Sequence, residues 1–145
     1  MAQTKKGVEL INHEDHAKFI QNKLKKNLDD FRPDIVHQSL LALLDTPLNK
    51  AGRLRVLIST KKGVLIRVNQ NIRLPRTYKR FSGLMAQLLT KMKIKSQEEG
   101  NEKGQMLLEI VNGPIETLLP SNSYKIGTST KGHLVPDLDA YFSQK

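Results

Sequence analysis

The sequence contains no cysteine and no tryptophan, and only 5% of its 145 residues are aromatic. Without cysteine there is no disulfide and no thiolate metal site, and a reducing compartment is favoured. No apolar run approaches the length that spans a membrane, and the first residues lack the apolar stretch of a signal peptide. The chain is therefore expected to be a soluble intracellular protein with no membrane partner and, by its length, one domain.

Acidic residues are missing from the middle of the chain. Between Thr46 and Gln97 there are 13 of the 24 Lys and Arg residues and no Asp or Glu, whereas 11 basic residues face 14 acidic ones elsewhere. The whole formal net charge of +10 therefore arises in this window. Such a concentrated positive field favours a polynucleotide partner through counterion release. The alternative is a solvated basic face kept for solubility, but charges of both signs usually serve that purpose.

The segment from Asn71 to Lys95 lies in this window, and the predicted binding site depends mainly on it. Pro75 keeps the chain before it extended, and Thr77 is placed to cap a helix. Apolar residues then recur at helical spacing: Phe81, Leu84, Met85, Leu88 and Leu89. The pattern predicts an amphipathic helix that packs one face on a core.

Four cations crowd the start of this helix: Arg73, Arg76, Lys79 and Arg80. Cations at a helix amino terminus oppose the helix dipole, so stability alone does not explain them. Phosphates of a polynucleotide do, because the helix amides and the guanidinium groups attract the same anion. We therefore predict that these residues bind the phosphates of a polynucleotide.

The remaining segments predict a mixed α/β domain over residues 8–145, preceded by a flexible tail over residues 1–7. Residues 53–60 and 63–69 alternate and are joined by a Lys-Lys-Gly turn, which predicts a β-hairpin. Residues 8–11, 106–111 and 124–129 are typical of further strands. Helices are predicted from His13 to Lys26, from Pro33 to Leu44 with most of its surface buried, and over residues 115–119.

Two carboxylates flank the helix that begins at Pro33. Asp34 lies in its first turn, where a carboxylate is favoured, whereas Asp45 near its end opposes the dipole. The interpretation from the residues is that Asp45 caps the turn that follows, through Thr46 and Pro47. His37 lies one turn after Asp34, which could orient it, but a packed or solvated histidine is the favoured interpretation.

Common catalytic signatures are absent from the sequence. It has no dinucleotide-binding or Walker glycine pattern, no G-x-S-x-G and no H-E-x-x-H. His13 and His16 are spaced for a metal but have no third ligand nearby, so no metal site is predicted. The residues alone indicate a basic α/β domain that binds a phosphate backbone, without revealing a reaction.

Several motifs together resemble one family. They are RPDIVHQSLL from Arg32, the following LLDTPLNKAG, the hairpin segment GVLIRVN and the segment IRLPRTYKRFSGLMAQLL. They are similar to the essential ribosome-biogenesis methyltransferases of the SPOUT, or trefoil-knot, class. The resemblance implies S-adenosylmethionine-dependent methylation of ring nitrogen 1 of a pseudouridine in small-subunit rRNA.

The resemblance also implies residue roles. Arg32, Arg73, Arg76 and Arg80 match arginines that contact RNA in this family, and Asp34 matches an aspartate beside them. The ring nitrogen must lose a proton before methyl transfer, so Asp34 or Asp45 is a candidate base or orienting group. The target base would be unpaired or flipped out to be reached.

The same resemblance implies a SPOUT-like parallel-sheet core with a β-hairpin, incomplete because family members continue past this chain into the carboxyl-terminal knot. That knot supplies most of the cofactor pocket, so no cofactor-binding residue is assigned here. A homodimer of the complete protein, pre-ribosomal assembly factors as partners, and a nucleolar location in a eukaryote or a cytoplasmic one otherwise are further expectations. A non-catalytic rRNA-binding assembly factor is the alternative.

Overall fold

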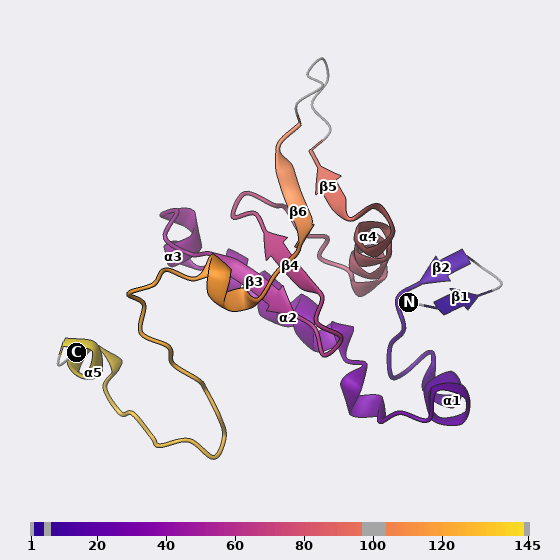
Figure 1. Ribbon diagram of the computed structural model, residues 1–145, viewed down its shortest axis with the longest axis horizontal. Helices are drawn as coiled ribbons and strands as arrows, with labels where there is room; N and C mark the ends of the chain where they lie inside the picture. The colour runs from indigo at the N-terminus through magenta and orange to yellow at the C-terminus, as the bar shows by residue number, and fades with distance from the viewer. Residues whose placement is uncertain (1, 5–6, 97–103, 144–145) are drawn as a thin grey trace. The chain divides into compact units, whose positions relative to one another are not determined.

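The computed structural model describes residues 2–4, 7–96 and 104–143, which divide into two compact units (Figure 1). The first unit extends to Ile115 and contains the described strands together with helices α1 to α4. The second begins at Glu116 and contains helix α5, Leu138–Ser143. A 3-10 turn, Ile115–Leu118, occupies the boundary and confirms the short helical turn predicted there.

A four-stranded antiparallel sheet with the order β3-β4-β6-β5 forms the centre of the first unit. Strands β3, Val56–Ser59, and β4, Leu65–Val68, form the predicted hairpin. Gly63 in its turn has φ +77°, a conformation that favours glycine. Strand β6, Met106–Val111, pairs with β4 on one side and with β5, Lys93–Lys95, on the other.

The expected parallel sheet is wrong for the described residues, because each of their strand pairs is antiparallel. Strands β4 and β5 do run in the same direction, since both are antiparallel to β6. They are joined through helix α4, as in a strand–helix–strand crossover. Strand β6 is inserted between them, however, and it replaces the parallel pairing with two antiparallel ones.

Two helices begin where the sequence predicts. Helix α2, Pro33–Leu44, starts at its proline, and helix α4, Tyr78–Lys91, has Thr77 at the cap position but makes no side-chain cap hydrogen bond. The short helix α3, Pro47–Lys50, is capped by the Thr46 hydroxyl, which accepts from the Asn49 amide. Asp45 therefore does not cap this turn.

The amino-terminal region departs from the predicted helix over His13–Lys26. It contains strands β1, Ala2–Thr4, and β2, Gly7–Glu9, then helix α1, Ala17–Phe19, a π-helical turn, Ile20–Leu24, and a 3-10 turn, Leu28–Asp30. Lys25 ends the π-helical turn in the left-handed conformation. Ile20 is the one buried residue of α1 and the π turn, so little apolar burial supports a longer helix.

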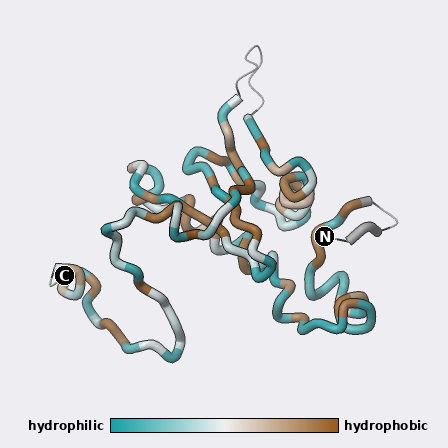
Figure 2. The backbone as a smooth tube through the Cα atoms, viewed as in Figure 1, coloured by the Kyte–Doolittle hydropathy of each residue, from teal (hydrophilic) through white to brown (hydrophobic). Residues whose placement is uncertain are grey.

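The core of the first unit lies between the sheet and helices α2 and α4, where hydrophobic residues gather (Figure 2). Phe81, Leu88, Ile66 and Leu108 are almost completely buried there. Helix α2 is less buried than predicted, because only His37 and Leu40 are buried while Ile35 and Leu43 are exposed. It packs one face on α4 and leaves the opposite face open.

The predicted strand over residues 124–129 is wrong. These residues have no regular secondary structure and all are exposed. A strand needs a hydrogen-bonded neighbour, and the described part of the second unit provides none. Within the described ranges, no helix is both long and apolar enough to cross a bilayer.

Candidate nucleic-acid interface

Buried and exposed side chains alternate in the basic segment between β4 and α4, and the buried ones anchor it. Ile72 and Leu74 are each 8% exposed, whereas Arg73 between them is exposed. In extended backbone successive side chains point to opposite sides, so anchoring the two apolar residues in the core directs Arg73 outward. We call residues 71–77 the arginine connection. It continues into α4, whose first turn carries the exposed side chains of Lys79 and Arg80.

Arg76 lies at the end of this connection and pairs with the last turn of α2. Its Nη1 donates to Asp45 Oδ2 at 2.7 Å and its Nη2 donates to Oδ1 at 3.2 Å. This two-point contact fixes the plane of the guanidinium group. The hydrogen bonds from Arg76 lower the pKa of the Asp45 carboxyl, and those same bonds raise the pKa of Arg76. Both side chains are more than half exposed, so the pair lies on the surface rather than inside.

Arg32 makes a similar contact at the other end of α2. Its Nε and Nη2 donate to the two carboxylate oxygens of Asp34, at 3.0 Å and 2.8 Å. Hydrogen bonding to Arg32 lowers the pKa of Asp34. His13 Nδ1 lies 3.8 Å from the same carboxylate, so Asp34 is placed between a guanidinium group and an imidazole. Asp34 contacts Arg32 and His13 rather than His37.

The two candidate carboxylates occupy opposite ends of one helix. Asp34 is in its first turn and Asp45 is the residue that follows Leu44. Eleven residues of helix rise separate them by about 16 Å. One substrate atom therefore cannot be within hydrogen-bond reach of both, and only one of them can act as the base.

His37 is a buried residue whose role the sequence did not settle. It is 1% exposed, and its Nε2 lies 2.7 Å from the carbonyl oxygen of Pro75 in the arginine connection. Its ring stacks on Phe81 of α4, with ring centroids 4.5 Å apart. Asp34 does not orient it. The available signal was its spacing three residues before Leu40, which places it on the buried face of α2.

Arg32, Arg73, Arg76, Lys79 and Arg80 thus come from three adjacent places in the first unit. These are the start of α2, the arginine connection and the first turn of α4. Arg32 and Arg76 make surface ion pairs, whereas Arg73, Lys79 and Arg80 make none within the described ranges. Their positive charge is available to an anion in solution.

Two surface hollows adjoin these residues. One, of about 250 Å³, is lined by Asp34, Ile35, His37, Gln38, Ser39 and Tyr78. The other, of about 320 Å³, is lined by Leu41, Leu44, Asp45, Ile72, Arg73, Leu74 and Arg76. The larger hollow carries two arginines and one carboxylate that is already paired. In the described ranges no group of His, Asp or Glu side chains is arranged to hold a metal ion.

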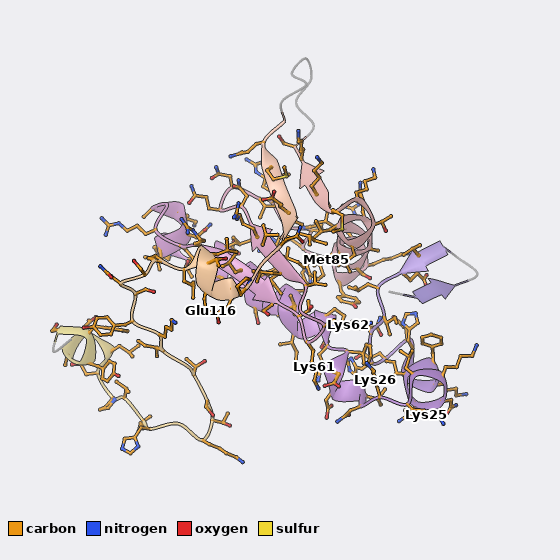
Figure 3. All side chains as sticks on the ribbon, in the orientation of Figure 1. Lys25, Lys26, Lys61, Lys62, Met85 and Glu116 are labelled. Carbon is orange, nitrogen blue, oxygen red and sulfur yellow. The ribbon has the colours of Figure 1, made fainter. Side chains whose placement is uncertain are left out.

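A second set of basic residues lies elsewhere on the first unit (Figure 3). Lys61 and Lys62 occupy the turn between β3 and β4, which we call the lysine turn, and both are exposed. Lys61 Nζ donates to Asp30. Lys25 and Lys26 precede this aspartate in the chain and follow the π-helical turn. The positive charge of the chain is therefore not confined to the arginine connection.

Comparisons with known proteins identify the family. The model of the EMG1/NEP1 methyltransferase family matches residues 1–143. The ribosomal RNA small subunit methyltransferase mra1 of Schizosaccharomyces pombe is 52% identical over 128 residues, covering 88% of this chain and 34% of the relative. The corresponding NEP1 of Homo sapiens is 44% identical over 135 residues, covering 92% of this chain and 52% of the relative.

A solved structure, Archaeoglobus fulgidus Nep1 bound to S-adenosylhomocysteine, is similar in fold. Its TM-score is 0.62 at 32% identity, and the match covers 77% of this chain and 47% of that one. The likeness confirms the predicted SPOUT class of α/β fold. This chain spans between about a third and a half of the length of the relatives it matches. From the family match over nearly all of its residues, the chain belongs to the EMG1/NEP1 methyltransferase family.

Proposed function

We propose that this chain supplies the rRNA-binding portion of an S-adenosylmethionine-dependent methyltransferase that modifies a pseudouridine of small-subunit rRNA during ribosome biogenesis. The names of the relatives support the substrate and the reaction class, since they are small-subunit rRNA methyltransferases. The observation that carries the assignment to this chain is the arginine connection. Its cations are directed outward by the buried residues Ile72 and Leu74, beside a helix that carries a carboxylate at each end.

In this proposal the phosphates of an rRNA hairpin contact Arg32, Arg73, Arg76, Lys79 and Arg80. RNA hairpin loops present unstacked bases, and the cations fix the backbone so that one base is displayed. The carboxylate that assists proton removal is Asp45 or Asp34, and the distance between them allows only one. Asp45 is the better placed, because it lines the larger hollow together with Arg73 and Arg76.

The hollows do not fit the cofactor. S-adenosylmethionine carries a positively charged sulfonium group, and the larger hollow already presents two arginines against one paired aspartate. The smaller hollow is lined by one aspartate that Arg32 and His13 already flank. We therefore assign no cofactor contact to the described residues.

Binding to RNA is the direct test of the proposal. The chain is titrated into a fluorescently labelled hairpin with the sequence of the small-subunit rRNA loop, at several salt concentrations. We expect affinity that falls steeply with salt, because phosphate contacts release counterions. A hairpin of scrambled loop sequence is the matched control, and equal affinity for both hairpins would point to a basic domain without sequence preference.

A second candidate function is a non-catalytic rRNA-binding assembly factor, and the poor fit of the hollows to the cofactor favours it for the chain by itself. Isothermal titration with S-adenosylmethionine is compared between this chain and a chimera extended by the carboxyl-terminal half of a relative. Cofactor binding and radiolabelled methyl transfer by the chimera support the enzyme. If neither protein binds the cofactor, the enzyme assignment fails and rRNA binding alone remains.

Homodimerisation of the complete protein, pre-ribosomal assembly factors as partners and a nucleolar location in a eukaryotic cell, or a cytoplasmic one otherwise, belong to the same proposal. The partners and the location follow from a role in ribosome assembly, and the homodimer is expected from the resemblance to the family. Size-exclusion chromatography with light scattering on the chimera tests the first of them.

A further inference from the structure

We propose that His37 is a positioning residue for RNA binding, which fixes the peptide group before Arg76 so that this arginine meets the rRNA backbone. The inference rests on the proposed function and assigns a role to a residue that is almost completely buried. His37 is 1% exposed and borders one hollow, so it presents almost no surface to RNA. Any effect it has on RNA binding must pass through its neighbours.

The hydrogen bond made by His37 determines which atom it controls. Its Nε2 lies 2.7 Å from the Pro75 carbonyl oxygen, which can only accept, so the ring carries its proton on Nε2. The Pro75 carbonyl belongs to the planar peptide group that also contains the Arg76 nitrogen and Cα. Holding this oxygen therefore fixes the plane from which the Arg76 side chain departs.

Arg76 is consequently held at two points by one helix. His37, which belongs to α2, holds the backbone of Arg76. Asp45, the residue after α2, holds its guanidinium group. The Asp45 contact is exposed and is weakened by salt. The His37 contact is part-buried and is screened less than the exposed Asp45 contact. It therefore holds the backbone of Arg76 in place when RNA displaces the Asp45 contact.

The face of the imidazole ring links a third element to the same contact. It stacks on Phe81 with centroids 4.5 Å apart and an interplanar angle of 21°. Phe81 is completely buried and lies on α4, the helix that carries Lys79 and Arg80 in its first turn. His37 thus contacts α4 as well as the arginine connection.

The second ring nitrogen distinguishes this role from ordinary packing. Nδ1 is buried and has no hydrogen-bond partner among the described residues. An unpaired buried acceptor is unfavourable, so Nδ1 does not account for a histidine at this position. The polar contact that the histidine makes here is the hydrogen bond from Nε2 to the Pro75 carbonyl oxygen.

A matched pair of variants tests the proposal in the full chain. His37→Gln keeps a donor of similar reach, whereas His37→Met has similar length and no donor, and neither keeps the ring. We expect His37→Met to lower affinity for the rRNA hairpin about fivefold to tenfold, the range expected for losing one positioning hydrogen bond. We expect His37→Gln to stay within about twofold of the unsubstituted chain. Thermal unfolding verifies that both variants are folded at the titration temperature.

The route through Arg76 is tested by a double-mutant cycle. In an Arg76→Ala background, His37→Met should change affinity by less than about twofold, because the residue that it positions is gone. A full additional loss in that background would overturn the proposal, as would unchanged affinity of His37→Met or an equal loss in His37→Gln. The last result would assign the effect to the shape of the ring.

A measurement without RNA separates this proposal from the proposed function. In a protein with ¹⁵N-labelled histidine and backbone amides, we expect His37 to be protonated at Nε2 and the Arg76 amide signal to shift in His37→Met but not in His37→Gln. If the unsubstituted chain binds no rRNA, the proposed function fails, and the Arg76 amide decides whether His37 holds this peptide. An unshifted Arg76 amide in His37→Met would overturn the contact itself.

Discussion

The arginine connection and the lysine turn are both short, basic and part of the acid-free window, yet the chain builds them differently. In the connection, buried Ile72 and Leu74 anchor the backbone, and Arg76 is held by its peptide group and by its guanidinium group. In the turn, Lys61, Lys62 and Gly63 are all exposed, and the ion pair of Lys61 with Asp30 is on the surface. The same number of cations is therefore presented differently in the two regions.

The two regions also differ in their basic residues, since the arginine connection carries arginine and the lysine turn carries lysine. A guanidinium group makes directional two-point contacts with carboxylates and phosphates, whereas an ammonium group on a flexible stem acts as a point charge. A rigid backbone therefore helps a guanidinium group to make its contacts and matters little to an ammonium group. The comparison indicates that the connection provides geometry for RNA recognition, while the turn contributes general attraction.

The buried support beneath the connection is the feature whose removal has the largest expected effect. Phe81 is completely buried, so Phe81→Ala should lower the free energy of unfolding by about 3–5 kcal/mol. Val64, beside the lysine turn, is only partly buried, so Val64→Ala should cost about 1 kcal/mol or less. Urea denaturation of both variants measures the difference. Equal costs would show that the two regions have equal support.

Charge-reversal variants test whether RNA responds to the geometry of the arginine connection or only to the net charge of the chain. Arg76→Asp and Lys62→Asp change the net charge equally, but Arg76→Asp also places a carboxylate beside Asp45. We expect Arg76→Asp to lower rRNA affinity about tenfold or more and to reduce the salt slope by about one. Lys62→Asp should lower affinity about threefold or less. Arg80→Asp should resemble Arg76→Asp.

The outcome of this comparison is read from titrations at two or more salt concentrations. Equal losses in Arg76→Asp and Lys62→Asp would mean that RNA responds to net charge alone. Affinity at the unsubstituted level in both Arg76→Asp and Arg80→Asp would remove these arginines from the interface.

The comparison also shows what the sequence could predict. The starts of α2 and α4 and the β3-β4 hairpin were predictable because proline, the cap position and alternation act over a few residues. The insertion of β6 between β4 and β5 was not, because strand order depends on contacts between residues about forty positions apart. The exposed face of α2 was missed for a similar reason, since its apolar residues do not specify how many neighbours will cover them.

For the candidate site too, one part could be predicted from the sequence and another part could not. The cations were visible as residue types at helical spacing, whereas their partners were not. The contacts of Arg76 with Asp45 and of His37 with Pro75 join residues 31 and 38 positions apart. Local pattern therefore located the basic surface, and tertiary structure determines how it is held.

The Arg32–Asp34 pair gives a smaller effect that depends on pH. Arg32 lowers the pKa of Asp34 in the folded chain, so the pair stabilises the fold above about pH 4, the region where an unfolded aspartate titrates. This stability is lost as the pH falls through the lower folded pKa. The side chains are more than a third exposed, so the contribution is small and decreases with salt. Asp34→Asn should therefore reduce the acid dependence of unfolding, measured from urea midpoints between about pH 6 and pH 3. If Asp34→Asn unfolded with the same pH dependence as the unsubstituted chain, the Arg32–Asp34 pair would not be the source of this stability.

The smallest expected effect concerns the lysine turn itself. Lys61→Ala removes the exposed pair with Asp30, and exposed pairs contribute little because water and salt screen them. We expect the free energy of unfolding to change by less than about 0.5 kcal/mol and rRNA affinity to change by less than about twofold. Arg73→Ala is the matched variant, because it also removes one exposed cation but from an anchored backbone, and it should lower affinity more. If Lys61→Ala weakened binding as much as Arg73→Ala, a rigid backbone would give a cation no advantage, and the lysine turn would have to be counted as part of the interface.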